Sequence, residues 1–211
     1  MAIDITCTSS PPYIYLICVP HTTEDEERYQ SQRKWVNEYT FGNEFDRLRM
    51  PDDCFPKALR IEKGKNLSDY NTGCKGGLVV SQRYKNLVES FEPGVHQFSP
   101  VEIFHRDGTP YGESFYYHRV YLFIDAVNPV LGGLEKSWMT AHPESNPDRY
   151  GWKFVRGSRD KLAVFKDKIA GRATWRDTRY FVVTFCSDAF VEKLKAGNFR
   201  GWQTINHWQE L

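Results

Sequence analysis

The chain has 211 residues, of which 40% are hydrophobic and 26% charged, so it can bury a core as one domain or two small subdomains. Its formal net charge of +1 excludes an overall field that would draw it to nucleic acid or to a membrane surface. Its five cysteines are widely spaced and form no C-x-x-C motif, which excludes a disulfide framework or a zinc pattern and fits reduced thiols.

The first long apolar run lies at residues 13–19, and we interpret it as a buried strand that ends at Pro20. The run is too short to span a bilayer. No basic segment or small-residue cleavage site frames it as a signal peptide. Together with the reduced thiols, this run predicts a soluble, cytoplasmic protein with no membrane partner.

A helix is predicted at residues 24–40, which are polar and charged. Thr22 or Thr23 is a suitable N-cap because a threonine hydroxyl can accept a hydrogen bond from a backbone N–H of the first turn. The acids that follow suit the first turn, where the helix macrodipole favours negative charge.

Turn-forming residues punctuate the next part of the chain. A turn is expected at residues 50–53, and a glycine-containing loop at residues 71–77. We take this loop as a boundary between an N-terminal subdomain or extension, residues 1–75, and a core, residues 76–211. The two parts are expected to form one continuous globular unit.

The chain then predicts a strand–helix–strand unit. A short apolar strand at residues 78–80 leads directly into Ser81, a favoured N-cap. Pro93 ends the helix, and residues 95–103 return as an extended segment, with Pro100 on an edge or bulge because it cannot donate to a ladder. One stripe of the helix carries the apolar residues Tyr84, Leu87, Val88 and Phe91.

A second unit of the same kind is predicted at residues 180–206. An apolar strand runs to Ser187, again a favoured N-cap, and Asp188 follows at the positive end of the helix. Gly197 is expected as the C′ residue. The apolar stripe consists of Phe190, Val191 and Leu194. We interpret the two units as a weak structural repeat packed in one core.

Extended patterns fill the remaining sequence. Residues 118–124 predict a strand, and residues 140–151 a polar, proline-bearing loop. Residues 162–165 and 178–185 predict two further strands, with Trp175 near the turn between them. The pattern is richer in strand than in helix and predicts an α+β fold of mixed, mainly antiparallel sheets with a few helices.

A search for catalytic motifs finds no phosphate-binding glycine loop, nucleophile elbow or zinc-protease pattern. No two histidines have metal-ligand spacing. The sequence therefore predicts no catalytic residue, metal or cofactor, and capping accounts for Ser81 and Ser187. An enzyme with an unrecognised site that uses Cys74 or His96 is one alternative.

The charges are unevenly distributed along the chain. An acidic run comprises Glu24, Asp25, Glu26 and Glu27, and residues 153–179 are rich in lysine and arginine interleaved with aromatics. Each run is either solvated or faces a partner of opposite sign. The aromatics of the basic segment alternate with the charges at strand spacing, so we expect them to point into the core and the cations outward. A regulator that binds nucleic acid through this segment is a second alternative, although nucleic acid is not the expected partner.

The stretch GGLVVSQRYKNLVESFEPGVHQFSPVEI, residues 76–103, resembles the bacterial immunity proteins of the Imm11 type. In that family a VVS strand-to-helix turn precedes a second strand, an extended middle, and a closing strand with a final helix. The corresponding pieces here are residues 78–103, 116–125 and 182–204, and the resemblance covers roughly residues 76–205. The family commonly closes its last strand with Phe or Leu, and this chain has Thr204-Ile205 there instead.

The resemblance implies a protein without catalytic residues that protects its own cell by binding a cognate toxin or effector of a polymorphic, contact-dependent or type VI secretion system. Such a binder needs a complementary charged face and a few buried anchors. For the two candidate tryptophans, Trp138 and Trp152, burial in the core is an alternative of equal weight to contact with the partner. The candidate partner-binding residues are Glu24, Asp25, Glu26, Glu27, Trp138, Arg149, Tyr150 and Trp152.

Overall fold

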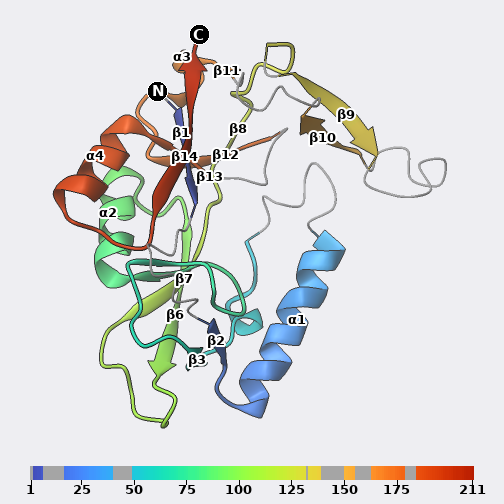
Figure 1. The fold of residues 1–211 in the computed structure, drawn as a ribbon. Coiled ribbons are helices and arrows are strands. Elements are labelled where there is room, and N and C mark those ends of the chain that lie inside the picture. Colours follow the sequence, from blue (N-terminus) through green and yellow to red (C-terminus); the bar gives the residue numbers. More distant parts are fainter. Residues whose placement is uncertain are drawn as a thin grey trace.

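Two six-stranded sheets, a separate hairpin and flanking helices make up the fold (Figure 1). The computed structural model describes residues 2–6, 17–39, 49–131, 133–138, 150–154, 163–178 and 184–211. Most strand pairs are antiparallel, and the parallel pairs are β3 with β6, β8 with β12 and β11 with β14. The predicted α+β class is confirmed.

The first sheet joins strands from both sides of residue 75. Its order is β2 (Ile17–Pro20), β3 (Ala58–Lys63), β6 (Gln97–Phe104), β7 (Phe115–Arg119), β5 (Val79–Ser81) and β4 (Tyr70–Asn71). Pro100 does not lie on an edge strand or a bulge as predicted, because β6 lies inside the sheet and Pro100 pairs in register with Tyr116 of β7. The pairing of β6 with β3 begins only at Glu102, so the missing N–H of Pro100 interrupts no ladder with β3. The division at residue 75 stays a prediction.

A backbone β-bridge between Cys18 and Cys74, which are not joined by a disulfide, brings the two edges of the first sheet together. Cys18 lies in edge strand β2, and Cys74 follows shortly after the opposite edge strand, β4. The N–H of Cys18 donates to the carbonyl of Gly73 at 3.3 Å, and the N–H of Lys75 donates to the carbonyl of Cys18 at 2.9 Å. The closed sheet encloses an apolar core to which both cysteines belong.

The second sheet contains a central strand that local sequence patterns did not predict. Its order is β11 (Ala163–Val164), β14 (Gln203–Glu210), β1 (Ala2–Thr6), β13 (Thr184–Ser187), β12 (Thr174–Asp177) and β8 (Phe123–Ile124). The unpredicted strand is β1, which pairs antiparallel with both β13 and β14. The first described strand, β1, therefore lies in the middle of this sheet, between two strands from the C-terminal part of the chain.

The helices of the described residues are α1 (Thr23–Tyr39), α2 (Gln82–Phe91), α3 (Lys166–Ile169) and α4 (Asp188–Ala196), with a 3₁₀ turn, η2 (Asp52–Cys54). Figure 1 shows α2 and α4 side by side, and their buried apolar residues belong to one core cluster. The hydroxyls of Ser81 and Ser187 accept hydrogen bonds from the backbone N–H groups of Tyr84 and Phe190. Both predicted caps are confirmed, as are the two strand–helix–strand units.

The predicted strand at residues 118–124 is wrong as a single element. Strand β7 ends at Arg119 in the first sheet, and β8 begins at Phe123 in the second. The intervening residues carry the chain between the sheets, and a continuous apolar run does not reveal such a crossing.

One expectation near the second unit is confirmed and another is corrected. Trp175 lies in β12, soon after the turn at residues 170–171, and it is fully buried and stacked on Phe185 with ring centroids 5.7 Å apart. Gly197 has φ −80°, and Asn198 takes the left-handed conformation with φ 50°. Asparagine tolerates this conformation, while a Cβ on Gly197 would lie 2.5 Å from the ring of Phe199, so a larger residue there would require that ring to shift.

The hairpin of β9 (Leu134–Trp138) and β10 (Tyr150–Phe154) forms a two-stranded sheet of its own. In Figure 1 it extends away from the two larger sheets. Residues 140–149 of the predicted polar loop, including Arg149, lie outside the described residues.

Candidate partner-binding surfaces

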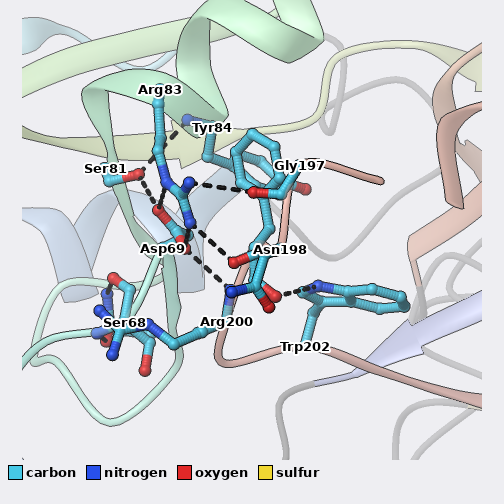
Figure 2. Close-up of polar contacts among 11 residues, drawn as sticks. Ser68, Asp69, Ser81, Arg83, Tyr84, Gly197, Asn198, Arg200 and Trp202 are labelled. Atoms are coloured by element: carbon cyan, nitrogen blue, oxygen red, sulfur yellow. Dashed lines mark hydrogen bonds and ion pairs between the residues drawn. The ribbon is translucent and has the colours of Figure 1, made fainter. Parts of the chain in front are cut away.

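A polar cluster that includes Ser81 joins the two strand–helix–strand units, and its contacts show whether capping accounts for this serine (Figure 2). Asp69 precedes β4 and is nearly buried, whereas Arg83 lies in the first turn of α2 and is half exposed. The Nε and Nη2 atoms of Arg83 each donate to one carboxylate oxygen of Asp69 at 2.6 Å. The same carboxylate accepts from the Ser81 hydroxyl at 2.7 Å and from the backbone N–H of Arg200 at 2.8 Å.

Arg83 also binds the end of α4. Its Nη1 donates to the carbonyl of Gly197 at 3.1 Å, and its Nη2 donates to the carbonyl of Asn198 at 3.0 Å. The last carbonyls of a helix lack partners within the helix, and a guanidinium supplies several donors in a fixed plane. One side chain therefore holds the start of α2 against the end of α4.

The cluster has the electrostatics of a structural ion pair. Burial raises the pKa of Asp69, but the hydrogen bonds from Arg83, Arg200 and Ser81 outweigh burial and lower the pKa below its usual value. The Ser81 hydroxyl donates to Asp69 and accepts from the N–H of Tyr84, so both roles serve packing. A hollow of about 540 Å³ lies beside the cluster, yet the donors of Arg83 face acceptors of the chain itself.

The acidic run lies at the start of α1, where its four members differ in their surroundings. Asp25 is 4% exposed. Asp25 and Thr22 cap the helix reciprocally, because the N–H of Asp25 donates to the Thr22 hydroxyl at 3.1 Å and the N–H of Thr22 donates to the Asp25 carboxylate at 3.2 Å. The other carboxylate oxygen accepts from the N–H groups of Lys57 and Ala58 at 2.7 and 3.0 Å. Asp25 thus attaches α1 to the start of β3, and Thr22 is confirmed as the N-cap.

The remaining acids of the run reach the surface. Glu24 and Glu27 are exposed, and Glu26 is half-buried. The Glu24 carboxylate pairs with Arg28 at 2.6 Å, and the Glu26 carboxylate accepts from Gln30 at 2.6 Å. These residues are placed where a partner can reach them, in contrast to Asp25.

An open groove of about 550 Å³ continues this acidic surface between α1 and the first sheet. Its lining includes the exposed acids Glu24, Glu102 and Glu113, and we call it the acidic groove. Its two cations, Arg28 and Lys57, donate to the backbone carbonyls of Asp53 and Asp52. The sequence analysis missed Glu102 and Glu113 because they are distant in sequence from the run that they extend.

The hairpin carries the other group of predicted anchors. The structure describes the backbone of Trp138, Tyr150 and Trp152, and Tyr150 pairs with Trp138 in the register while Trp152 pairs with Lys136. Directly paired residues share a face, as do residues two apart along a strand. The register therefore assigns the three aromatic positions to one face of the hairpin, and their contact role stays a prediction.

A turn directly before the hairpin exposes two apolar side chains that the sequence analysis did not select. Val130 is 85% exposed and Leu131 is 53% exposed. The side-chain oxygen of Asn128 accepts from the N–H groups of both residues at 3.0 Å, and the N–H of Leu134 donates to the carbonyl of Pro129 at 2.9 Å. These bonds fix the turn and present an adjacent apolar pair to solvent, a feature that suits a contact surface.

Cys74 and His96, the residues of the enzyme alternative, have different surroundings. His96 is buried, with its Nε2 atom 2.9 Å from the Glu92 carboxylate and 3.2 Å from the Thr174 hydroxyl. The backbone N–H of Tyr121 donates to its Nδ1 atom at 3.3 Å. Cys74 lies instead in the core of the first sheet, at the bridge to Cys18.

The basic segment follows its predicted orientation where it is described, over residues 163–178. Lys166, Lys168 and Arg172 are exposed, whereas Trp175 is fully buried. The ammonium group of Lys168 donates to the carbonyl of Asp125 at 2.6 Å. These three cations therefore point outward and Trp175 points inward, whereas Arg176 in β12 is half-buried with its Nε atom away from solvent.

The described residues contain no group of three or more His, Cys, Asp or Glu side chains placed to hold a metal ion. Among the described helices, none combines the length and the apolar character needed to cross a bilayer.

Comparison with known protein families matches residues 7–206 to the immunity protein family Imm11. A search of curated proteins finds no match to the chain. The family match includes the N-terminal third, where the resemblance in the sequence was loose, and it spans strands of both large sheets. The chain therefore belongs to the Imm11 family of immunity proteins.

Proposed function

We propose that this chain protects the cell that makes it by binding a cognate toxin and covering that toxin's active surface. The observation that supports the proposal most strongly is the family match over residues 7–206. The toxin would be an effector of a polymorphic, contact-dependent or type VI secretion system that acts in the cytoplasm, where the immunity protein would intercept it.

The arrangement of surface and core suits this role. A steric inhibitor needs a rigid body, a charged face that accelerates association, and a few anchors that bury on binding. The acidic groove supplies negative charge, and the turn at Val130 and Leu131 supplies exposed apolar groups. A toxin with a basic substrate-binding surface, such as a nuclease, is the partner that the acidic groove fits best.

We propose further that protection requires no catalysis. The serines at the two strand-to-helix turns are occupied as helix caps, and the donors of Arg83 are occupied by Asp69 and by the end of α4. Binding without turnover predicts protection in proportion to the amount of the chain.

Co-expression tests the proposal. The toxin is expected to be encoded by the reading frame beside that of this chain, and the chain should restore growth of cells that express it. Loss of rescue in Cys74→Ala or His96→Ala, in proteins that still fold and still bind the toxin, would instead support enzymatic protection. Strongly salt-dependent binding of generic DNA or RNA, without toxin binding, would support the nucleic-acid alternative.

A further inference from the structure

A third hollow of about 570 Å³ lies where the first sheet closes. It is formed by the middle of α1 on one side and by the glycine-rich loop at residues 72–77 on the other, with Arg119 from the end of β7. We call it the seam hollow, because the loop contains the bridge of Cys74 to Cys18 that joins the two sheet edges.

The charges that line the seam hollow have one sign. Its cations are Arg33, Lys75 and Arg119, and no aspartate or glutamate is among its lining residues in the described part of the chain. Arg33 and Lys75 are exposed, and Arg119 is half-buried. The Arg119 guanidinium also lies 5.6 Å from the centroid of the Tyr121 ring and 3.9 Å from the Met50 sulfur, so Arg33 and Lys75 are the exposed cations of the hollow.

The ring of Tyr29 contacts two of these cations. The guanidinium of Arg33 lies 6.0 Å from the centroid of the Tyr29 ring, and the ammonium group of Lys75 lies 5.5 Å from the same centroid. Both cations are attracted to the same ring, while their like charges repel each other. An anion bound in the hollow near both would offset this repulsion.

The walls of the hollow are held in place by contacts that do not involve its cations. The Gln32 side chain donates to the carbonyl of Gly76 at 2.7 Å, and the Tyr117 hydroxyl donates to the carbonyl of Lys75 at 3.2 Å. Gly76 has φ 94°, and a Cβ there would lie 3.0 Å from the Tyr117 ring, so the loop conformation requires glycine. The hollow is therefore preformed, which lowers the entropic cost of binding.

We propose that the seam hollow receives a carboxylate-bearing segment of the partner protein, and the proposal rests on the toxin-binding function proposed above. Sequence-tolerant binding of single-stranded nucleic acid needs free aromatic faces along a basic groove. Here the Tyr29 ring already contacts two cations, and the charge is confined to one hollow. Acidic side chains of a protein loop match the size and sign of the site.

The placement on α1 strengthens the argument. The same helix carries exposed acids in its first turn and Arg33 more than two turns later. A toxin that presents basic groups to the acidic groove and an acidic loop to the seam hollow would contact α1 in only one orientation. Such paired charges specify register as well as speeding association.

The first test uses a probe that does not depend on the toxin. A fluorescently labelled ten-residue glutamate peptide is titrated with the purified chain, and anisotropy is measured at low and high salt. The double variant Arg33→Glu/Lys75→Glu should weaken binding by at least about tenfold, equivalent to about 1.4 kcal/mol. The control Lys65→Glu/Arg106→Glu makes the same charge change at exposed positions elsewhere and should weaken binding by less than about twofold.

Equal weakening by the two variants, or no binding of the peptide by the wild-type chain, would overturn the proposal. Labelled oligouridine serves as a parallel probe. If the chain binds oligouridine more strongly than the glutamate peptide, and the Arg33→Glu/Lys75→Glu variant loses that binding, the proposal is overturned in favour of nucleic acid. Circular dichroism and thermal unfolding check that both variants fold.

A second arm uses the toxin encoded beside this chain, and it separates the two proposals. If the glutamate peptide binds at the seam hollow but the toxin does not bind the chain at all, the proposed function fails and the anion-binding site stands. If the toxin binds wild type and the Arg33→Glu/Lys75→Glu variant equally well, the seam hollow is not part of the interface and this inference fails alone.

Discussion

Arg83 and Asp69 are joined by two hydrogen bonds of 2.6 Å, and through this pair the start of α2 is tied to the end of α4. The two helices also share an apolar cluster that includes Tyr84 and Phe190, whose rings meet edge to face at 6.0 Å. The ion pair therefore sets how the two strand–helix–strand units meet, and a rigid joint of this kind suits a protein that acts by shape.

Replacing Arg83 with alanine should lower the free energy of unfolding by about 2–3 kcal/mol, because Asp69 then loses two charge-assisted hydrogen bonds while its carboxylate stays nearly buried. Arg83→Lys should recover part of this loss, since lysine cannot form the two-pronged contact. Urea denaturation measures both. The exposed control Arg106→Ala should change stability by less than about 0.5 kcal/mol, and an Arg83→Ala effect that small would refute the role of the pair.

The two capping serines should differ in their contributions. Ser187→Ala removes one cap and should cost about 1 kcal/mol. Ser81→Ala removes a cap and also the hydroxyl that donates to Asp69 at 2.7 Å, so its cost should be about 2 kcal/mol. Threonine at either position should retain most of the stability. Chemical denaturation of the four variants decides the point, and equal losses for both alanine variants would contradict the extra bond of Ser81.

Stability should fall in mild acid because of His118. Burial lowers the pKa of His118 well below its usual value, and the neighbouring His96 and Arg176 lower it further. Below about pH 6.5 the unfolded chain gains a proton at this histidine that the folded chain does not, so the free energy of unfolding decreases as the pH falls from about 7.5 to about 5.5. The buried carboxylates act in a different window, since the lowered pKa values of Asp25 and Asp69 make their stabilisation disappear only in stronger acid.

The variant His118→Gln should reduce this pH dependence, measured as the difference in unfolding free energy between pH 7.5 and 5.5. The half-buried His105 provides the control, and His105→Gln should leave most of the dependence in place. An unchanged difference in the His118 variant would show that other groups cause the loss.

The acids at the start of α1 should differ in role: Asp25 should stabilise the fold, whereas Glu24 and Glu27 should contribute to toxin binding. Asp25→Asn should lower the free energy of unfolding by about 1–2 kcal/mol, because Asp25 accepts hydrogen bonds from the first turn and from β3. The double variant Glu24→Lys/Glu27→Lys should retain stability but slow association with the toxin by about tenfold at low salt. Stopped-flow kinetics at two salt concentrations would detect this, and an unchanged rate would remove the acidic groove from the interface.

The exposed pair at the turn before the hairpin should act as an anchor. Val130→Ser/Leu131→Ser should change unfolding free energy by less than about 0.5 kcal/mol, because both side chains are largely exposed, yet weaken toxin binding by at least about tenfold. Trp138→Ala and Trp152→Ala extend the test. If the tryptophan contacts the toxin, the variant should lose toxin affinity alone; if it lies in the core, the variant should lose about 3–5 kcal/mol in free energy of unfolding. Full affinity in all of these variants would exclude the hairpin region.

Patterns contained within a short stretch of sequence were predicted well. Ser81 and Ser187 precede apolar stripes at helical spacing, and a cap followed by such a stripe specifies the start of a helix through local contacts alone. The same holds for the acids after Thr22, whose reciprocal bonds with Asp25 lie within one turn.

Features that depend on distant partners were not predicted. The strand β1 (Ala2–Thr6) is defined by pairing with β13 and β14 at the other end of the chain. Trp175 is an apolar residue in a short strand whose position between β13 and β8 no local periodicity encodes. The surfaces have the same origin, since Glu24, Glu102 and Glu113 meet in one groove only after β3 and β6 have paired.

Titrating the purified toxin with the purified chain tests most directly whether protection comes from occupancy. The account predicts that toxin activity falls in a straight line, reaches its minimum when the two proteins are equimolar, and stays constant with time at every ratio. A small fraction of an equivalent that silences the toxin progressively would contradict it, as would full toxin activity in the presence of excess chain.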